Sequence, residues 1–119
     1  MDHTICHFEI PADDPEALAQ FYRELFGWDI GLFEGLMEYW YIKTAPEGEG
    51  VNGGMMRRQH PQQGIMNYIL VESVDEYAKK AESLGATIHM GKTAVGDMGW
   101  FAILMDPQHN CIAIWETKE

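Results

Sequence analysis

The stretch His7-Phe8-Glu9-Ile10-Pro11-Ala12-Asp13-Asp14-Pro15-Glu16 decides how this chain folds, because it predicts a strand that leads into a capped helix. Side chains along a strand point alternately to its two faces. His7 and Glu9 therefore share one face, and Phe8 and Ile10 share the other. The apolar face suits packing against the following helix. The face with the imidazole and the carboxylate is where we expect a functional site.

The helix after this strand has clear start and stop signals. Asp13 or Asp14 is a suitable N-cap, and Pro15 fits a first helical turn. Gly27 is expected to end the helix. Between these signals, apolar residues recur at steps of three and four, which predicts one apolar stripe: Leu18, Phe21, Tyr22, Leu25 and Phe26.

The same order of elements occurs twice along the chain. After the first helix, strands are expected at 28–33, 37–44 and 51–56, with a hairpin turn near 34–35. After a polar stretch come a strand at 67–72, a helix from Asp75 to Gly85, and strands at 86–92, 99–105 and 110–116. Landmarks of the two halves lie about 60 residues apart, which indicates an internal repeat: Asp14 with Asp75, Gly27 with Gly85, Trp40 with Trp100, and Pro46 with Pro107.

The repeat predicts the architecture. Residues 1–119 are expected to form one α+β domain of two βαβββ units, at about 1–57 and 66–117, joined by a linker at about 58–65. One unit alone buries too little surface for a good core. The expected fold is therefore a curved eight-stranded mixed sheet, with both helices on one face and a concave cavity on the other. Such a cavity is a natural ligand site.

Composition narrows the functions to consider. The net charge of −11 argues against nucleic acid and against anionic membrane surfaces as partners. No apolar run approaches the roughly 18 residues of a membrane helix, and we expect no signal peptide. Cys6 and Cys111 make no disulfide framework, so a reduced, cytoplasmic protein is expected.

Two stretches resemble the vicinal oxygen chelate superfamily, which includes glyoxalase I, bleomycin-resistance proteins and extradiol dioxygenases. They are His7-Phe8-Glu9-Ile10 running on to Phe21-Tyr22-Arg23-Glu24-Leu25-Phe26-Gly27-Trp28, and Gly99-Trp100-Phe101-Ala102 running on to Asp106-Pro107, Asn110 and Ile114-Trp115-Glu116. The chain looks most similar to small bacterial proteins related to lactoylglutathione lyase. The resemblance implies the fold more strongly than a reaction. It also implies a homodimer.

The metal enzymes of this superfamily hold zinc, nickel, iron or manganese with four cavity-facing ligands, on the first and fourth strands of each unit. Carried over to this chain, those positions fall on His7, on Tyr68 (or on Ile69 if a bulge intervenes), on Gly53 and on Ala113. Only His7 is a good ligand, because glycine and alanine have no donor and a neutral tyrosine is a poor one. Glu9 could supply a second donor. A catalytic zinc ion needs three protein ligands, so we expect no metal cofactor.

Two interpretations of the site residues stay open. His7 can be a hydrogen-bonded histidine without function, and Gly53 with Gly54 can mark a bulge. Alternatively, small residues at Gly53 and Ala113 clear the cavity floor, with Met55 and Trp115 on the same faces.

The leading hypothesis is a protein that binds a small, partly aromatic or apolar molecule through His7, Glu9, Tyr68 and Trp115. It would be either a sequestering protein or a metal-free enzyme in which His7 or Glu9 carries a proton. The rival is a metal-dependent glyoxalase-like lyase or isomerase, or an enzyme related to the dioxygenases. A third class is an interaction module without a ligand.

Overall fold

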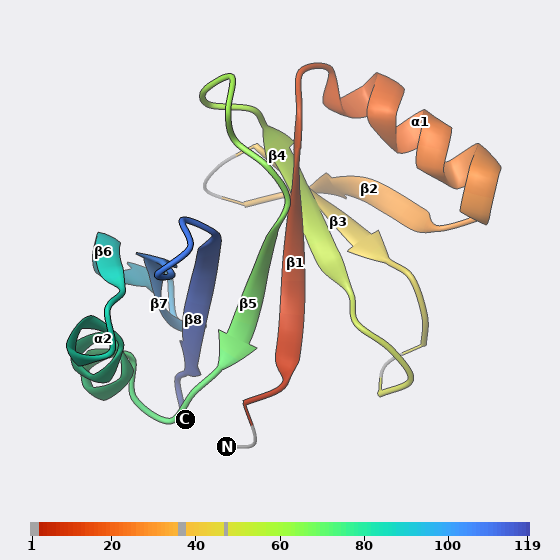
Figure 1. Cartoon of the computed structure of the whole chain (residues 1–119). Coiled ribbons are helices and arrows are strands. Elements are labelled where there is room, and N and C mark those ends of the chain that lie inside the picture. The colour runs from red at the N-terminus through yellow and green to blue at the C-terminus, as the bar shows by residue number, and fades with distance from the viewer. Residues whose placement is uncertain (1–2, 36–37, 47) are drawn as a thin grey trace. The chain divides into compact units, whose positions relative to one another are not determined.

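The computed structural model describes residues 3–35, 38–46 and 48–119. Over these residues the chain forms eight strands and two helices: β1 (Ile5–Ala12), α1 (Pro15–Phe26), β2 (Asp29–Phe33), β3 (Tyr39–Lys43), β4 (Gly53–Arg57), β5 (Met66–Leu70), α2 (Val74–Ser83), β6 (Thr87–Val95), β7 (Gly99–Met105) and β8 (Cys111–Thr117) (Figure 1). The α+β class and the repeated βαβββ order are confirmed. Met37, where the sequence predicts the start of a strand, lies outside the described residues.

The chain divides into two compact units. The N-terminal unit is His7–Ile65, and the C-terminal unit combines residues 3–6 with Met66–Glu119. The strand order is β2-β3-β4-β1 in the first and β5-β8-β7-β6 in the second. The pairs β1 with β4 and β5 with β8 are parallel, and the other pairs are antiparallel, so each unit has a mixed sheet, as predicted.

Helix α1 begins and ends at the residues that the sequence indicates. Asp14 is the N-cap, and its side chain accepts a hydrogen bond of 3.2 Å from the amide of Ala17. Gly27 ends the helix in the left-handed conformation, with φ of 71°, which glycine adopts without a steric penalty. The resulting helix lies beside the strands of its own unit (Figure 1).

Helix α2 begins earlier than the sequence predicts. Its N-cap is Ser73, which accepts from the amide of Glu76 at 3.2 Å, so Asp75 lies within the first turn. The carboxylate of Glu116 adds a second interaction by accepting from the amide of Val74 at 2.9 Å. Ser73 is thus the counterpart of Asp14, and the pairing of Asp14 with Asp75 is wrong. Serine and aspartate are equally good N-caps, and the sequence offered both.

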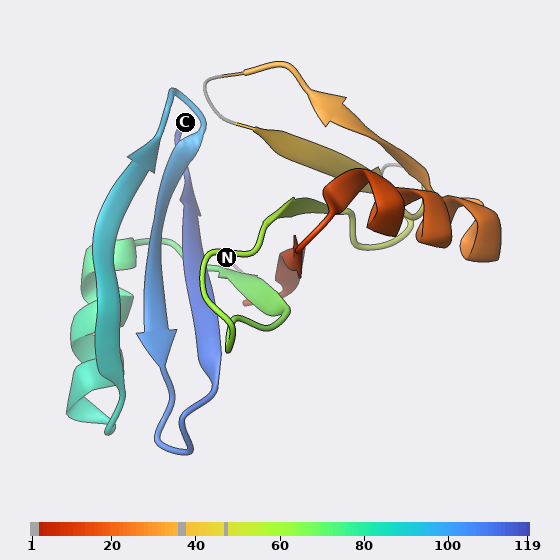
Figure 2. The same cartoon turned by 90° about the horizontal axis from the view of Figure 1, so that it is seen from above.

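Each unit has its own core between its helix and one face of its sheet. In the N-terminal unit the buried cluster consists of Ile10, Ala12, Ala19, Ile30, Trp40, Ile42 and Met55. In the C-terminal unit it consists of Val71, Val74, Ala102, Leu104 and Ile114, and α2 runs along this face of β6, β7 and β8 (Figure 2). Neither helix within the described residues is long and apolar enough to span a bilayer.

Candidate functional site

Strand β1 presents its two sets of side chains as the sequence predicts. Ile10 belongs to the buried cluster under α1, and Phe8 packs against that cluster. By alternation, His7 and Glu9 point to the face of β1 away from α1. That face also carries Tyr39 and Tyr41, because Tyr41 pairs with Gly54, and Gly54 pairs with Glu9.

A hydrogen-bonded network joins three side chains on this face. The Nε2 atom of His7 lies 2.8 Å from the hydroxyl of Tyr39, and that hydroxyl donates to Oε2 of Glu9 at 3.1 Å. The rings of His7 and Tyr39 are nearly parallel, with centroids 6.4 Å apart and planes 15° from parallel. We call His7, Tyr39 and Glu9 the polar network.

Gly54 leaves the room that the side chain of Tyr39 needs to reach His7 and Glu9. Strand β4 lies between β3, which carries Tyr39, and β1, which carries His7 and Glu9. Tyr39 must therefore cross β4 to reach its partners. A Cβ atom on Gly54 would overlap the ring and the hydroxyl of Tyr39, so only glycine leaves the room that this crossing requires.

Burial affects the titration of His7. Desolvation lowers the pKa of His7 below its ordinary value, because a partly buried imidazolium loses hydration. His7 is therefore neutral at neutral pH. A neutral imidazole has one N–H donor and one acceptor nitrogen, so it can both donate and accept in a network of this kind.

The structure corrects the placement of Gly53 and Met55. Strand alternation read from the sequence predicts both on the face of His7, but Met55 is completely buried in the cluster under α1. Gly53 lies on that same face, where a Cβ would overlap the ring of Phe8. The residue that faces Tyr39 is Gly54. A one-residue shift in a strand exchanges its faces, and the turn before β4 is one residue longer than the repeat alignment assumed.

In the C-terminal unit the predicted site residues lie on two paired strands. Tyr68 pairs with Ala113, and Leu70 pairs with Trp115. Since Ile114 belongs to the cluster beneath α2, Tyr68, Ala113 and Trp115 lie on the opposite face by alternation. The ring of Tyr68 lies 6.3 Å from that of Phe101, centroid to centroid.

These placements change the set of positions at which the superfamily would hold a metal. Counted back seven residues from the observed caps, the counterpart of His7 is Met66, and not Tyr68. Strand pairing makes Gly54, in place of Gly53, the counterpart of Ala113. A thioether suits hard divalent ions poorly, and glycine and alanine offer no donor.

The residues present do not fit the superfamily's metal. Among the described residues, no three His, Cys, Asp or Glu side chains are grouped as a metal ion requires. At the carried-over positions and beside them, the described part of the chain offers two good ligands, His7 and Glu9, which is fewer than the three protein ligands of a catalytic zinc ion.

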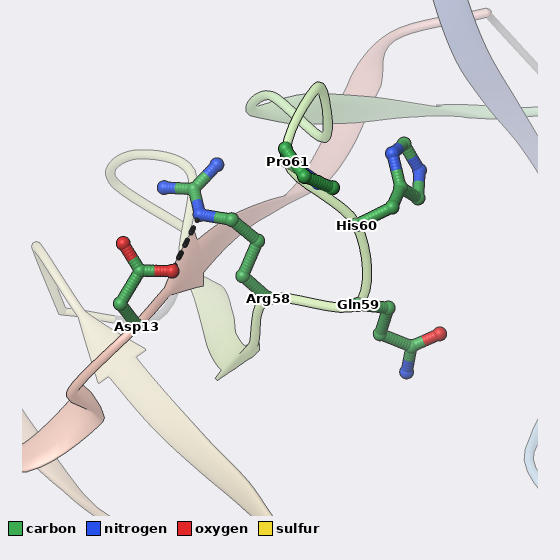
Figure 3. A pocket seen from close by; sticks show the side chains of 5 residues that line it. All are labelled: Asp13, Arg58, Gln59, His60 and Pro61. Carbon is green, nitrogen blue, oxygen red and sulfur yellow. Dashed lines mark hydrogen bonds and ion pairs between the residues drawn. The ribbon is translucent and has the colours of Figure 1, made fainter.

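An open hollow of about 610 Å³ lies at the end of β1, lined by Asp13, Arg58, Gln59, His60 and Pro61 (Figure 3). Nε of Arg58 donates to Asp13 at 3.0 Å, and its Nη1 donates to the carbonyl oxygen of Gln63. The amide of Arg58 also donates to the carbonyl oxygen of Ala12 at 2.8 Å. These bonds attach the predicted linker to the end of β1. They give Arg58 a structural role.

Tyr39 and Gly54 are the site residues that the sequence analysis missed. The sequence contains a signal for each: two successive glycines within a strand are unusual, and Tyr39 alternates with Trp40, whose burial could have fixed the face of β3. The contact between Tyr39 and Gly54 depends on the register between β3 and β4, which the sequence of one strand alone does not reveal.

The fold and the face described above define an α+β protein of two βαβββ units, the class to which the vicinal oxygen chelate proteins belong. The family model for the glyoxalase-like domain matches residues 7–114. The chain therefore belongs to the glyoxalase-like domain family, within the vicinal oxygen chelate superfamily. No curated protein sequence matches it.

Solved structures agree on the fold. A hypothetical protein from Bacillus halodurans is 15% identical, with 100% of this chain and 97% of that chain covered and a TM-score of 0.74. Methylmalonyl-CoA epimerase from Mycobacterium tuberculosis is 12% identical, with 96% and 87% covered and a TM-score of 0.69. The Streptomyces coelicolor epimerase, in complex with 2-nitronate-propionyl-CoA, is 15% identical, with 98% and 99% covered and a TM-score of 0.72. Identities this low establish the fold alone.

Proposed function

We propose that this glyoxalase-like protein binds a small organic molecule at the polar network, without the complete metal site of its superfamily. The protein is then a sequestering protein or a metal-free enzyme in which His7 or Glu9 carries a proton. We further propose Tyr68, Ala113 and Trp115 as ligand-binding residues on the face of their own unit.

The polar network is the observation that carries the proposal. A histidine, a tyrosine and a glutamate from two strands meet on the face of the sheet opposite the buried cluster under α1. The glycine beneath Tyr39 costs strand stability, since glycine weakens a strand interior. A few convergent polar groups beside aromatic rings are typical of a small-molecule site.

The metal-dependent alternative receives no support from the residues. Met66, Gly54 and Ala113 stand at three of the four positions where the superfamily places ligands. We therefore assign no step of a reaction to a metal ion.

A library of small aromatic and apolar compounds, screened by chemical-shift changes in the intact protein, tests the proposal. We expect binders whose effects centre on Gly54 and Tyr39, and whose binding weakens in His7→Ala without loss of the fold. His89→Ala, a substitution at an exposed histidine in β6 of the other unit, is the matched control and should bind as the parent does. If binding and melting temperature fall together in His7→Ala, His7 is structural and the proposal fails.

Incubation of a bound compound in D2O separates the two forms of the proposal. A metal-free enzyme that uses His7 or Glu9 as a proton carrier exchanges a carbon-bound proton of its substrate for deuterium. A sequestering protein leaves the compound unlabelled.

We also propose a homodimer. Large apolar side chains on α1 remain about half exposed, with 52% for Phe21, 57% for Leu25 and 57% for Phe26. Side chains of this size gain stability when an interface covers them. Light scattering on the purified protein measures the mass directly, and a monomer of 13.6 kDa at all concentrations would refute the proposal.

A further inference from the structure

We propose that the face of the C-terminal sheet opposite α2 binds a neutral, planar aromatic group of a small molecule, which stacks on the rings of Phe101 and Trp115. This inference rests on the proposed function, because it names the chemistry of the molecule that Tyr68, Ala113 and Trp115 contact. It excludes ligands that must place a charge on this face.

The strand-paired positions described on this face carry no charged side chain. Its centre, which we call the aromatic face, consists of Tyr68 of β5 and three cross-strand pairs of β7 and β8: Phe101 with Trp115, Ile103 with Ala113, and Met105 with Cys111. Between them along the strands, Leu104 and Ile114 point into the buried cluster beneath α2. Strands β7 and β8 are therefore apolar on both faces. A sheet face that meets only water is ordinarily polar, so this face is suited to being covered.

The corresponding face of the N-terminal unit differs in charge. There the side chains opposite α1 include His7 and Glu9 on β1, Asp29 on β2 and Lys43 on β3. The two units repeat one order of elements, so the fold itself does not require an uncharged face. The difference indicates that the aromatic face is adapted to a neutral occupant.

The indole of Trp115 lies along the sheet. A Cβ atom on Gly99 would stand 2.8 Å from Cζ2 of Trp115, so the six-membered ring lies over this glycine of β7. Nε1 of the same indole donates to Oγ1 of Thr117 at 3.0 Å. The single polar atom of the indole is thus bonded within its own strand, and the ring offers an apolar surface for stacking.

The rings of Tyr68 and Phe101 lean toward each other across β8. Their strands, β5 and β7, lie on either side of β8, so the two backbones are two strand spacings apart, about 9–10 Å. The ring centroids are nevertheless 6.3 Å apart. Ala113 of β8 pairs with Tyr68 and has no exposed surface. Its small side chain leaves room for both rings, which a larger one would push apart.

A neutral aromatic ring suits this surface better than a charged ligand or a polypeptide does. Phe101, Ile103 and Ala113 have no polar side-chain atom, so a charge placed on them would lose its hydration without replacement. A protein partner forms about one hydrogen bond per 100–200 Å² of interface, and these residues offer none. A planar ring gains stacking contacts there and has no polar group to satisfy.

Three probes test the inference in the intact protein: naphthol, naphthoate and the saturated decahydronaphthol. Chemical shifts of the Ala113 methyl group and the Trp115 indole N–H report binding on the aromatic face, and those of the Gly54 amide report binding at the polar network. We expect naphthol to bind the aromatic face. Naphthoate should bind there roughly tenfold more weakly, because its charge is desolvated without a partner. Decahydronaphthol should bind roughly three- to tenfold more weakly, because it cannot stack.

Matched variants separate stacking from general hydrophobicity. Phe101→Leu and Trp115→Leu should each weaken naphthol binding roughly three- to tenfold, whereas Trp115→Phe keeps a ring and should retain most of the affinity. Phe33→Leu makes the same change at a half-exposed phenylalanine of the other unit and should leave naphthol binding unchanged. The amide shifts of Leu104, in the cluster beneath α2, verify that each variant is folded.

Several outcomes would overturn the inference. Equal weakening in Phe101→Leu and Phe33→Leu is one, and naphthoate binding as tight as naphthol binding is another. Shifts of the Ala113 methyl group that follow protein concentration alone would show that a second copy of the chain covers the aromatic face. Naphthol bound only at the polar network would overturn the inference and leave the proposed function intact. If no compound of the library binds anywhere, the proposed function fails, and this inference fails with it.

Discussion

Tyr39 lies across Gly54, and its hydroxyl stands 2.8 Å from Nε2 of His7 on the far side of strand β4. The contact joins the first and third strands of the unit through a position without a side chain. Neither residue would reach the other if β4 carried a Cβ there. The polar network thus depends on a glycine that takes no part in its chemistry.

Gly54→Ala should therefore disrupt the network by displacing Tyr39. The overlap is with a ring held in place by two hydrogen bonds, and we expect a loss of roughly 1–3 kcal/mol in the free energy of unfolding. The ¹⁵N shifts of His7 should change as well. Denaturant unfolding and NMR measure the two effects.

Gly64→Ala is the control for this prediction. A Cβ at Gly64 meets nothing within 4 Å, so the substitution should change stability by no more than about 0.5 kcal/mol. If Gly54→Ala is as mild as Gly64→Ala, Tyr39 has room to move aside, and the steric argument is wrong.

The lowered pKa of His7 predicts a dependence of stability on pH. A group with a lower pKa in the folded state binds fewer protons when folded, so stability falls as the pH drops below the unfolded value near 6.5. His7→Gln removes this contribution and should lose less stability than the parent between about pH 7 and pH 5. Carboxylates titrate in both proteins, so the difference between the two curves isolates His7. Parallel curves would contradict the prediction.

Neighbouring methionines should differ in their effect on stability. Met55 is completely buried under α1, and truncation to alanine should leave a cavity and destabilise the fold by about 2–5 kcal/mol. Met56 is only half-buried and points to the other face, so Met56→Ala should be milder. Thermal or denaturant unfolding compares the two. The reverse order would show that the face assignment of β4 is wrong.

Metal analysis of the purified protein tests whether His7 and Glu9 can hold a metal ion. We expect no near-stoichiometric zinc, nickel, manganese or iron(II) after the purified protein is dialysed against each ion, because His7 and Glu9 are too few ligands for a tight site. Stoichiometric metal that disappears in His7→Ala would refute this expectation and favour the metal-dependent enzyme.

Much of the local structure could be predicted from the sequence, because single residues encode it. The alternation in β1 correctly predicts Ile10 in the core and His7 with Glu9 on the opposite face. Asp14 and Gly27 mark the two ends of α1, because each is a favoured capping residue. These rules act over a few residues. They need no knowledge of partner strands.

The errors arose where spacing had to be counted across turns. One extra residue before β4 places Gly53 and Met55 on the core face, and Ser73 caps α2 in place of the predicted Asp75. Tyr39 could not be assigned at all, because its role depends on the register of β3 against β4 and of β4 against β1. Contacts across three strands are a property of tertiary structure.

Two successive glycines leave β4 with bare backbone on both faces. The ring of Phe8 covers Gly53 on one side, and the ring of Tyr39 covers Gly54 on the other. The ring of Tyr39 thus covers the backbone of β4 at Gly54. A molecule that lifts this ring would expose those amides to solvent and accelerate their hydrogen exchange. We therefore expect this face to bind molecules that contact the side of the Tyr39 ring more readily than molecules that must displace the ring from Gly54.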